Sequence, residues 1–196
     1  MKIIEDMGNK VGLHVAKNNY WSSHGVEVLR APLPVGDYVL VNDKIQDVLD
    51  RKTKRGIEPH KMDFLGTYSV CVDTKRDVEE ISANLIGKAH ARFRDEVILA
   101  QNNGIKLYVL VENRDGIKEV RDVFRYTSKR RLNWLKYNKL HQEGRALHVV
   151  IPSKAPVSGE QLAKCMLTMQ LKYGVEFVFC KPEEAGAKVI ELLSKQ

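Results

Sequence analysis

Two acidic residues and one lysine stand in a pattern that could do chemistry on a phosphate group. Asp37 follows Gly36, and a single residue separates Asp73 from Lys75. Two carboxylates that converge can hold a divalent metal ion through hard oxygen ligands. Side chains two residues apart on a strand project from the same face, so Lys75 would lie beside Asp73. The metal ion could polarise a phosphoryl oxygen, and the Lys75 ammonium could position a water and offset negative charge. Hydrolysis of a phosphodiester requires these functions.

Apolar periodicity predicts the elements that must position these residues. Residues 36–41 are expected to form a strand that begins after the proline-rich turn 31–34. Residues 67–72 are expected to form a second strand, because they are rich in β-branched and aromatic side chains. The intervening segment 42–66 is polar and strongly charged, so we expect a loop or excursion there and no core. Both acids would then lie at or near strand ends.

The remaining elements alternate between helix and strand. Apolar residues spaced by three and four predict one helix over residues 78–103. The apolar run 107–111 predicts a strand that is buried on both faces of a sheet. Strands separated by helices indicate an α/β sheet with right-handed crossovers. The later elements are expected to be a strand at 146–151, a helix at 158–173, a strand at 175–180 and a helix ending at 193.

Length and composition fit one globular domain in a reducing compartment. The 196 residues are 43% hydrophobic and 29% charged. We expect a single domain over 1–196, with a core at about 1–112 and closing helix-strand-helix units at about 146–196. The sequence has neither the ~20 consecutive apolar residues of a membrane-spanning helix nor a signal peptide's apolar stretch. The chain has three cysteines, and their spacing does not match that of a metal site. We therefore expect free thiols and a cytoplasmic location.

The chain is basic, with 32 Lys and Arg against 25 Asp and Glu. This balance permits binding to a polyanion without establishing it. The densest basic run, residues 128–141, interleaves cations with aromatic residues, so cations could bind phosphates while a ring stacks on an exposed base. The run equally fits an amphipathic helix with Leu132, Leu135 and Leu140 inward and its cations in water. The nucleic-acid-binding candidates in it are Lys129, Arg130, Arg131, Lys136 and Lys139.

The order of these motifs resembles a known family. Residues 33–38, L-P-V-G-D-Y, are followed by the acid-x-lysine strand, a helix and residues 101–112, Q-N-N-G-I-K-L-Y-V-L-V-E. This order is similar to the XPF-type nuclease domain of the restriction-endonuclease-like (PD-(D/E)XK) superfamily, closely over 1–112 and more loosely to the end. The resemblance implies a mixed sheet flanked by helices. It also implies a DNA endonuclease, which is a hydrolase that uses Mg²⁺ or Mn²⁺. Specificity for particular DNA structures is a further expectation.

The resemblance also assigns roles to individual residues. Asp37 and Asp73 take the positions of metal ligands, and Lys75 joins them as the third catalytic residue. Glu79 falls on the family's next acid, four residues after the lysine, and is a further candidate. Arg92 lies in the predicted helix and would bind a phosphate if it faced the site, although it could also form a surface pair with Glu96, four residues further on.

Several positions depart from the family pattern. Asp73 replaces the usual glutamate, and Thr74 replaces an arginine. In the first strand Asp6 matches an aspartate, but Gly8 and Asn9 stand where the family has Arg and Glu. These departures keep open the alternative of a catalytically silent nucleic-acid-binding module with the same fold.

Two further alternatives follow from the sequence. Residues 50–52, D-R-K, match the family's acid-Arg-Lys more literally than 73–75, but they run into a segment with Pro59 that cannot continue as the expected long helix.

The expected partner is DNA, and no membrane is expected. The sequence shows no helix-hairpin-helix module, so structure recognition would come from a homodimer or a partner protein. A third interpretation is an assembly protein whose basic face is incidental.

Overall fold

A single mixed sheet forms the centre of the molecule. The computed structural model describes residues 1–12, 14–145 and 147–195. In this part of the chain, six strands form a sheet with the order β2-β1-β3-β4-β5-β6. Strand β3 is antiparallel to both of its neighbours, and the remaining pairs are parallel. The strands are β1 (Lys2–Asp6), β2 (Glu27–Ala31), β3 (Tyr38–Leu40), β4 (Val70–Lys75), β5 (Lys106–Glu112) and β6 (Glu176–Cys180).

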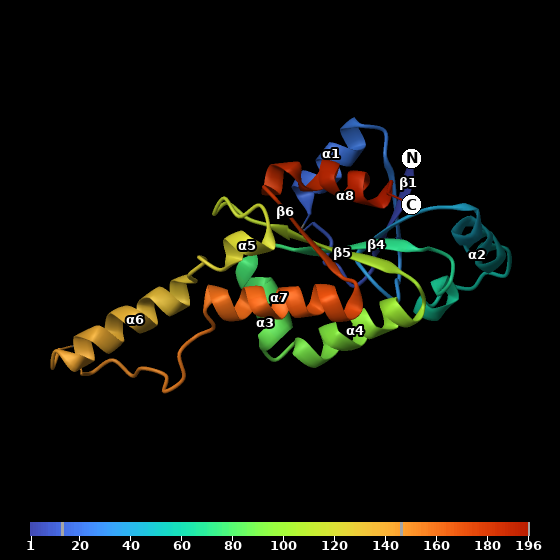
Figure 1. Cartoon of the computed structure of the whole chain (residues 1–196). Helices are drawn as coiled ribbons and strands as arrows, with labels where there is room; N and C mark the ends of the chain where they lie inside the picture. Colours follow the sequence, from blue (N-terminus) through green and yellow to red (C-terminus); the bar gives the residue numbers. More distant parts are fainter. Residues whose placement is uncertain (13, 146, 196) are drawn as a thin grey trace.

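Helices cover both faces of this sheet, which confirms the expected α/β architecture (Figure 1). On one face α1 and α8 bury Trp21 and Val189 against the strands. On the opposite face α3, α4 and α7 bury Phe93, Val97 and Met166. The helices are α1 (Val15–Ser23), α2 (Asp43–Lys54), α3 (Val78–Ile86), α4 (His90–Asn102), α5 (Val120–Val123), α6 (Lys129–Gln142), α7 (Gly159–Tyr173) and α8 (Ala185–Leu193).

The register of β4 and β5 determines where polar side chains can gather. The two strands are parallel, with Asp73 opposite Val109 and Lys75 opposite Val111. Their carboxyl ends therefore meet at one edge of the sheet, and Glu112 ends β5 at that same edge. Ligand sites in open α/β sheets commonly lie outside such strand ends.

The prediction of a loop over 42–66 is wrong, because this segment contains α2 and a 3₁₀ turn over Lys61–Phe64. The Asn42 side chain caps α2 by accepting a hydrogen bond from the Ile45 amide (3.0 Å). Ile45 and Phe64 are fully buried in the core. The apolar repeat of α2 is short and lies among many charged residues. The charged composition therefore suggested a loop although the segment is an amphipathic helix.

The prediction of one helix over 78–103 is also wrong, because α3 ends at Ile86 and α4 begins at His90. Gly87 separates the two helices with an extended backbone conformation, and its amide donates to Ala83 O (3.0 Å). A Cβ atom on Gly87 would lie 2.6 Å from that same oxygen. The apolar face was predicted correctly at Ile81, Leu85, Phe93, Val97 and Ala100, which are buried, whereas Ala89 is half-buried.

The predicted strand 146–151 is not present, since residues 147–151 form no strand and Ala146 lies outside the described residues. Helix α6 projects away from the sheet, and the chain after it returns alongside the helix (Figure 1). A strand needs a hydrogen-bonding neighbour, and the sheet edge is not within reach of this segment. The alternative of an amphipathic helix with inward leucines is wrong at Leu132 and Leu135, which are exposed, whereas Leu140 is half-buried.

Two further findings concern membrane-spanning helices and the cysteines. In the described residues, no helix is both long and apolar enough to cross a membrane. The three cysteines, Cys71, Cys165 and Cys180, are all free thiols. Burial raises the pKa of the Cys71 thiol well above its usual range.

Candidate active site

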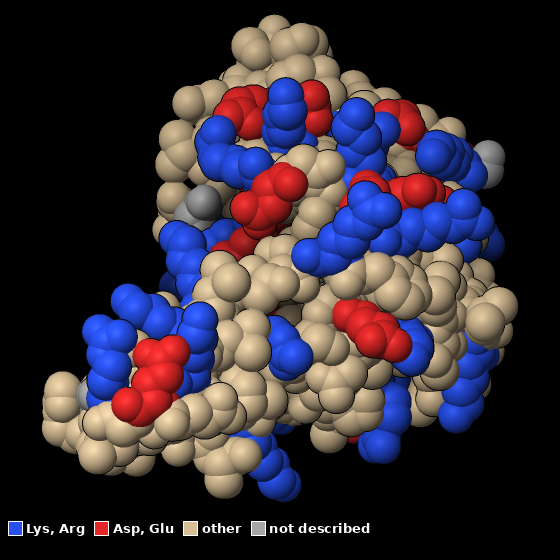
Figure 2. All heavy atoms as spheres, turned by 60° about the vertical axis from the view of Figure 1, so that its left-hand side comes forward, with Lys and Arg blue, Asp and Glu red and all other residues tan. Residues whose placement is uncertain are grey.

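A cavity of about 820 Å³ lies at the edge of the sheet where β4 and β5 end. Its wall contains Asp37, Asp73 and Lys75 from the strands and their turns, and Arg92 and Glu96 from α4. Figure 2 brings forward the side of the molecule on which β5 ends and shows a surface hollowed near its centre, with both basic and acidic side chains around it. The structure therefore brings together the three residues that the sequence singled out first.

Asp73 and Lys75 form a buried ion pair on the face of β4 that packs against α4. Lys75 Nζ donates a hydrogen bond to Asp73 Oδ1 (2.8 Å) and lies 2.6 Å from Oδ2. Both residues are less than 10% exposed, and Lys75 Nζ lies 5.7 Å from the centre of the Phe93 ring. Asp73 Oδ2 accepts no hydrogen bond of suitable geometry from the described residues. Oδ2 is therefore in ion-pair contact with the Lys75 ammonium, and a metal ion would have to share this oxygen with Lys75.

The electrostatics of this pair favour an added positive charge. Burial raises the pKa of Asp73 well above its usual range. The positive charge of Lys75 lowers this pKa, whereas the nearby Asp37 and Glu96 carboxylates raise it further. Burial lowers the pKa of Lys75, but the same three carboxylates outweigh it and raise that pKa. Three carboxylates face one ammonium group, so a divalent cation would relieve the excess negative charge.

Asp37 is held between β1 and β4 by its own backbone. Its amide donates to Val72 O (2.8 Å), and its carbonyl accepts from the Asp6 amide (2.7 Å). Its Oδ2 accepts hydrogen bonds from the Thr74 amide (2.8 Å) and the Thr74 hydroxyl (2.7 Å). The next residue, Tyr38, is fully buried and packs edge-on against Trp21 with ring centres 5.1 Å apart. Thr74 therefore orients Asp37.

These donors fit a hard divalent cation in chemistry. Both Asp37 and Asp73 offer a carboxylate oxygen that accepts no hydrogen bond from the described residues, namely Oδ1 of Asp37 and Oδ2 of Asp73. Mg²⁺ and Mn²⁺ prefer such oxygens and keep several waters when only two carboxylates are present. Among the described residues there is no group of three His, Cys, Asp or Glu side chains arranged as a metal site. Water or a substrate phosphate would have to complete the coordination.

Helix α4 is tied to the turn that carries Asp37. Glu96 Oε1 accepts a hydrogen bond from the Gly36 amide (2.9 Å), so Glu96 does not form the surface pair with Arg92 that the sequence also allowed. Arg92 lies in the cavity wall and is exposed. Its guanidinium is therefore available to an anionic ligand in the cavity.

The other acids that the sequence proposed lie in different surroundings. Glu79 is exposed on α3 and outside the cavity wall, whereas its neighbour Glu80 lines the cavity and accepts from the Arg76 amide (2.9 Å). Asp6 does line the cavity, but both of its carboxylate oxygens accept backbone hydrogen bonds, from the Leu33 amide (2.8 Å) and the Gly8 amide (3.1 Å). Asp50 lies on α2, outside the cavity wall, and accepts from the Gln46 side chain (2.8 Å). Sequence spacing alone could not tell which of the adjacent acids Glu79 and Glu80 lines the cavity.

The far wall of the cavity contains a second buried ion pair that sequence reasoning missed. Lys17 on α1 pairs with Glu112 at the end of β5, and Lys17 is only 4% exposed. His14 lies nearby, and burial together with the positive charge of Lys17 lowers its pKa. Helix α1 has little apolar periodicity, so no pattern marked Lys17 as a buried residue. The pair joins α1 to the strand end beside the site.

Gly36 allows a prediction about the turn before Asp37. Its φ is +75°, and a Cβ atom there would lie 2.9 Å from Cys71 Cβ. We expect Gly36→Ala to lower the free energy of unfolding by about 2–4 kcal/mol, because backbone strain and steric overlap add. Gly56 has φ +64° but open space around it, so Gly56→Ala should show the backbone strain alone. Urea unfolding measures both variants, and equal losses would contradict the steric contribution.

The fold and the comparisons define the class of this protein. The mixed sheet with its flanking helices is an α/β fold similar to the XPF nuclease domain. The model of the ERCC4 domain matches residues 13–193. The chain therefore belongs to the ERCC4 domain family, a family of nucleases.

One solved structure extends this comparison to three dimensions. XPF from Aeropyrum pernix, determined in complex with DNA, superimposes with a TM-score of 0.52 and 16% sequence identity. The match covers 98% of this chain and 63% of that one, so this chain spans less than two thirds of its length. No curated protein matches the chain in sequence. At this identity the structural likeness shows a shared fold.

Proposed function

We propose that this chain is a divalent-metal-dependent deoxyribonuclease that cleaves DNA internally by hydrolysing phosphodiester bonds. The observation that carries the proposal is the buried Asp73–Lys75 pair beside Asp37 in the wall of one cavity. Family membership supports nuclease chemistry. The DNA complex of the structurally similar XPF supports DNA as the substrate.

Each residue of the site has a role that its contacts support. Asp37 and Asp73 would hold Mg²⁺ or Mn²⁺ through the oxygens that accept no hydrogen bond from the described residues. When bound, such an ion polarises a phosphoryl oxygen and makes water more acidic. Lys75 positions the attacking water and offsets the negative charge that develops on the phosphate. Arg92 on α4 binds a phosphate oxygen in the cavity.

Several residues support this site from outside. Thr74 fixes the orientation of Asp37, and Glu96 fixes the Gly36 turn against α4. Precise placement of reacting groups accounts for a large part of enzymatic rate enhancement. We extend the proposed DNA contact to the exposed basic residues of α6, which are Lys129, Arg130, Lys136 and Lys139. The fifth candidate, Arg131, instead donates a hydrogen bond to Pro156 O. Recognition of a particular DNA structure would come from a second copy of the chain or a partner protein.

A cleavage panel tests the proposed function. Labelled single-stranded, duplex, flap and fork DNA would be incubated with the purified chain in Mn²⁺, Mg²⁺ or EDTA. We expect internal cleavage in Mn²⁺ or Mg²⁺ and none in EDTA, and the preferred substrate would reveal structure specificity. DNA binding without cleavage in either metal would reject the nuclease and favour the silent nucleic-acid-binding module. Neither binding nor cleavage would reject the nucleic-acid function altogether.

A further inference from the structure

The positive charge of the chain is concentrated in one projecting segment. Residues 128–157, which we call the arm, comprise α6 and the segment that returns beside it. The arm contains seven of the 32 Lys and Arg residues but only one of the 25 Asp and Glu residues. It therefore carries a net charge of +6, while the rest of the chain carries +1. Most of the attraction for a polyanion beyond the cavity thus comes from the arm.

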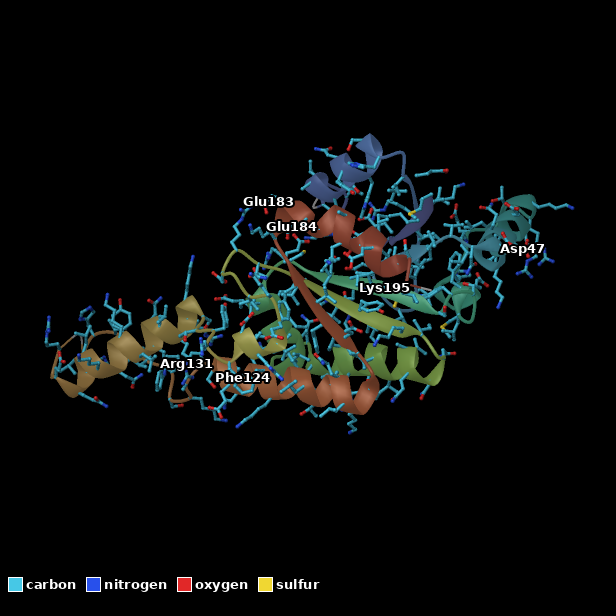
Figure 3. All side chains as sticks on the ribbon, turned by 45° about the horizontal axis from the view of Figure 1, so that its top comes forward. Asp47, Phe124, Arg131, Glu183, Glu184 and Lys195 are labelled. Atoms are coloured by element: carbon cyan, nitrogen blue, oxygen red, sulfur yellow. The ribbon has the colours of Figure 1, made fainter. Side chains whose placement is uncertain are left out.

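The arm is held as a defined structure by contacts between its two halves. Trp134 Nε1 donates to Pro152 O (2.8 Å), and Arg131 Nη1 donates to Pro156 O. The Arg145 amide also closes the turn at the tip by donating to Leu140 O (2.8 Å). At the base, where Figure 3 places Phe124 and Arg131, a Cβ atom on Gly159 would lie 2.3 Å from Val123 O. The arm is therefore closely packed at its junction with the body.

Three lysines share the side of α6 that is free of the returning segment. Lys129, Lys136 and Lys139 are separated by seven and three residues, so they lie along one face of the helix. All three are exposed, and in the described part of the chain none lies within ion-pair distance of an acidic group. By contrast, Arg131 turns toward the returning segment. From 129 to 139 the row is about 15 Å long, because a helix rises 1.5 Å per residue.

This row fits the phosphate backbone of a duplex better than unpaired bases. A single strand is usually bound by aromatic rings on which its bases stack. Trp134 instead donates to Pro152 on the other side of the helix, and the face with the three lysines has Leu132 as its intervening side chain. A straight row of about 15 Å matches the rise of about four base pairs of a stiff duplex. Lysine-phosphate contacts of this kind carry no sequence information.

We propose that Lys129, Lys136 and Lys139 bind the phosphate backbone of a DNA duplex that flanks the cleavage site. This inference rests on the proposed function for the location of the cleaved bond. The position of the arm supports it, because Glu112 at the end of β5 lines the cavity, and the chain leaves that edge through α5 into α6 (Figure 1). A duplex leaving the cavity on this side would pass along the arm. Substrates with a long duplex flank should then bind more tightly than substrates with a short one.

Binding measurements without metal test the arm separately from catalysis. The variant K129Q/K136Q/K139Q would be compared with K44Q/K54Q/K172Q, which removes three exposed lysines from α2 and the end of α7. Fluorescence anisotropy in EDTA would give the affinity for a duplex of about 20 base pairs across a range of salt concentrations. We expect the arm variant to lose about 2–3 units of the slope of log affinity against log salt. The control should lose less than about 1 unit.

The outcomes separate this inference from the proposed function. Equal slopes in the arm variant and the control would overturn the arm as a DNA contact. Equal losses on single-stranded and duplex DNA would overturn its assignment to a duplex. In Mn²⁺, the wild type should cleave a long-flank substrate faster than a short-flank one, and the arm variant should cleave both at the short-flank rate. If no substrate is cleaved but the slope difference persists, the nuclease proposal fails and duplex binding by the arm stands.

Discussion

Replacing Asp73 by asparagine should reduce the rate of metal-dependent DNA cleavage by at least about a thousandfold, because it removes a metal-binding charge from the reacting centre. Asparagine keeps the shape of the side chain and can still accept a hydrogen bond from Lys75 through its amide oxygen. The fold and the exposed DNA-binding residues should therefore be preserved. Single-turnover cleavage of a labelled substrate in Mn²⁺ measures the loss, and anisotropy should show DNA affinity within about threefold of the wild type.

The matched control for this variant is Asp50→Asn. Asp50 precedes Arg51-Lys52 in the sequence motif that competes with Asp73, but it lies on α2, outside the cavity wall. The Asp50→Asn variant should cleave at the wild-type rate. If Asp50→Asn lost activity and Asp73→Asn kept it, the catalytic centre would have been assigned to the wrong acid. An Asp73→Asn variant that also lost its DNA affinity would point to a binding defect.

The Lys17–Glu112 pair supports the second large prediction. Lys17→Met should lower the free energy of unfolding by about 3–5 kcal/mol, because removing one partner leaves the other charge buried and uncompensated. Glu112 is left in the wall of the cavity, with only 13% of its side chain exposed. Urea unfolding followed by circular dichroism measures the change, since a chain of this size gives a cooperative transition that can be fitted.

A double variant tests the electrostatic cause of that loss. Lys17→Met combined with Glu112→Gln removes both charges, so its free energy of unfolding should recover by about 1–3 kcal/mol relative to Lys17→Met alone. A loss below about 1 kcal/mol in Lys17→Met would show that water or another group compensates Glu112. A double variant no more stable than Lys17→Met would assign the loss to packing of the lysine side chain instead.

Much of the fold could be predicted because its apolar patterns are strong. Strand β5 is a continuous apolar run, and the face of α4 with Phe93 and Val97 repeats at helical spacing. The choice of Asp73 over Asp50 as a site candidate followed from the elements around each acid. An apolar strand precedes Asp73 and a helix follows it, whereas α2 surrounds Asp50. The structure places only the first of these acids at the cavity.

The remaining features depend on interactions that sequence patterns do not contain. The buried face of α2 consists of Ile45 and Val48, two apolar residues among many charges. The break at Gly87 depends on the backbone between two helices that share one apolar face. Lys17 is buried because Glu112, distant in sequence, lies opposite it. The apolar residues of 147–151 suggested a strand, but α6 carries them away from the sheet edge.

In the proposed nuclease, Asp37 and Asp73 act together in one catalytic centre. The most direct test is the single-turnover cleavage rate of the wild type, Asp37→Asn, Asp73→Asn and the double variant in Mn²⁺. Residues that act as one unit are strongly non-additive, so the three variants should show residual rates within about threefold of one another. A double variant slowed by the product of the two single losses would contradict a shared centre, as would wild-type cleavage by any of the three.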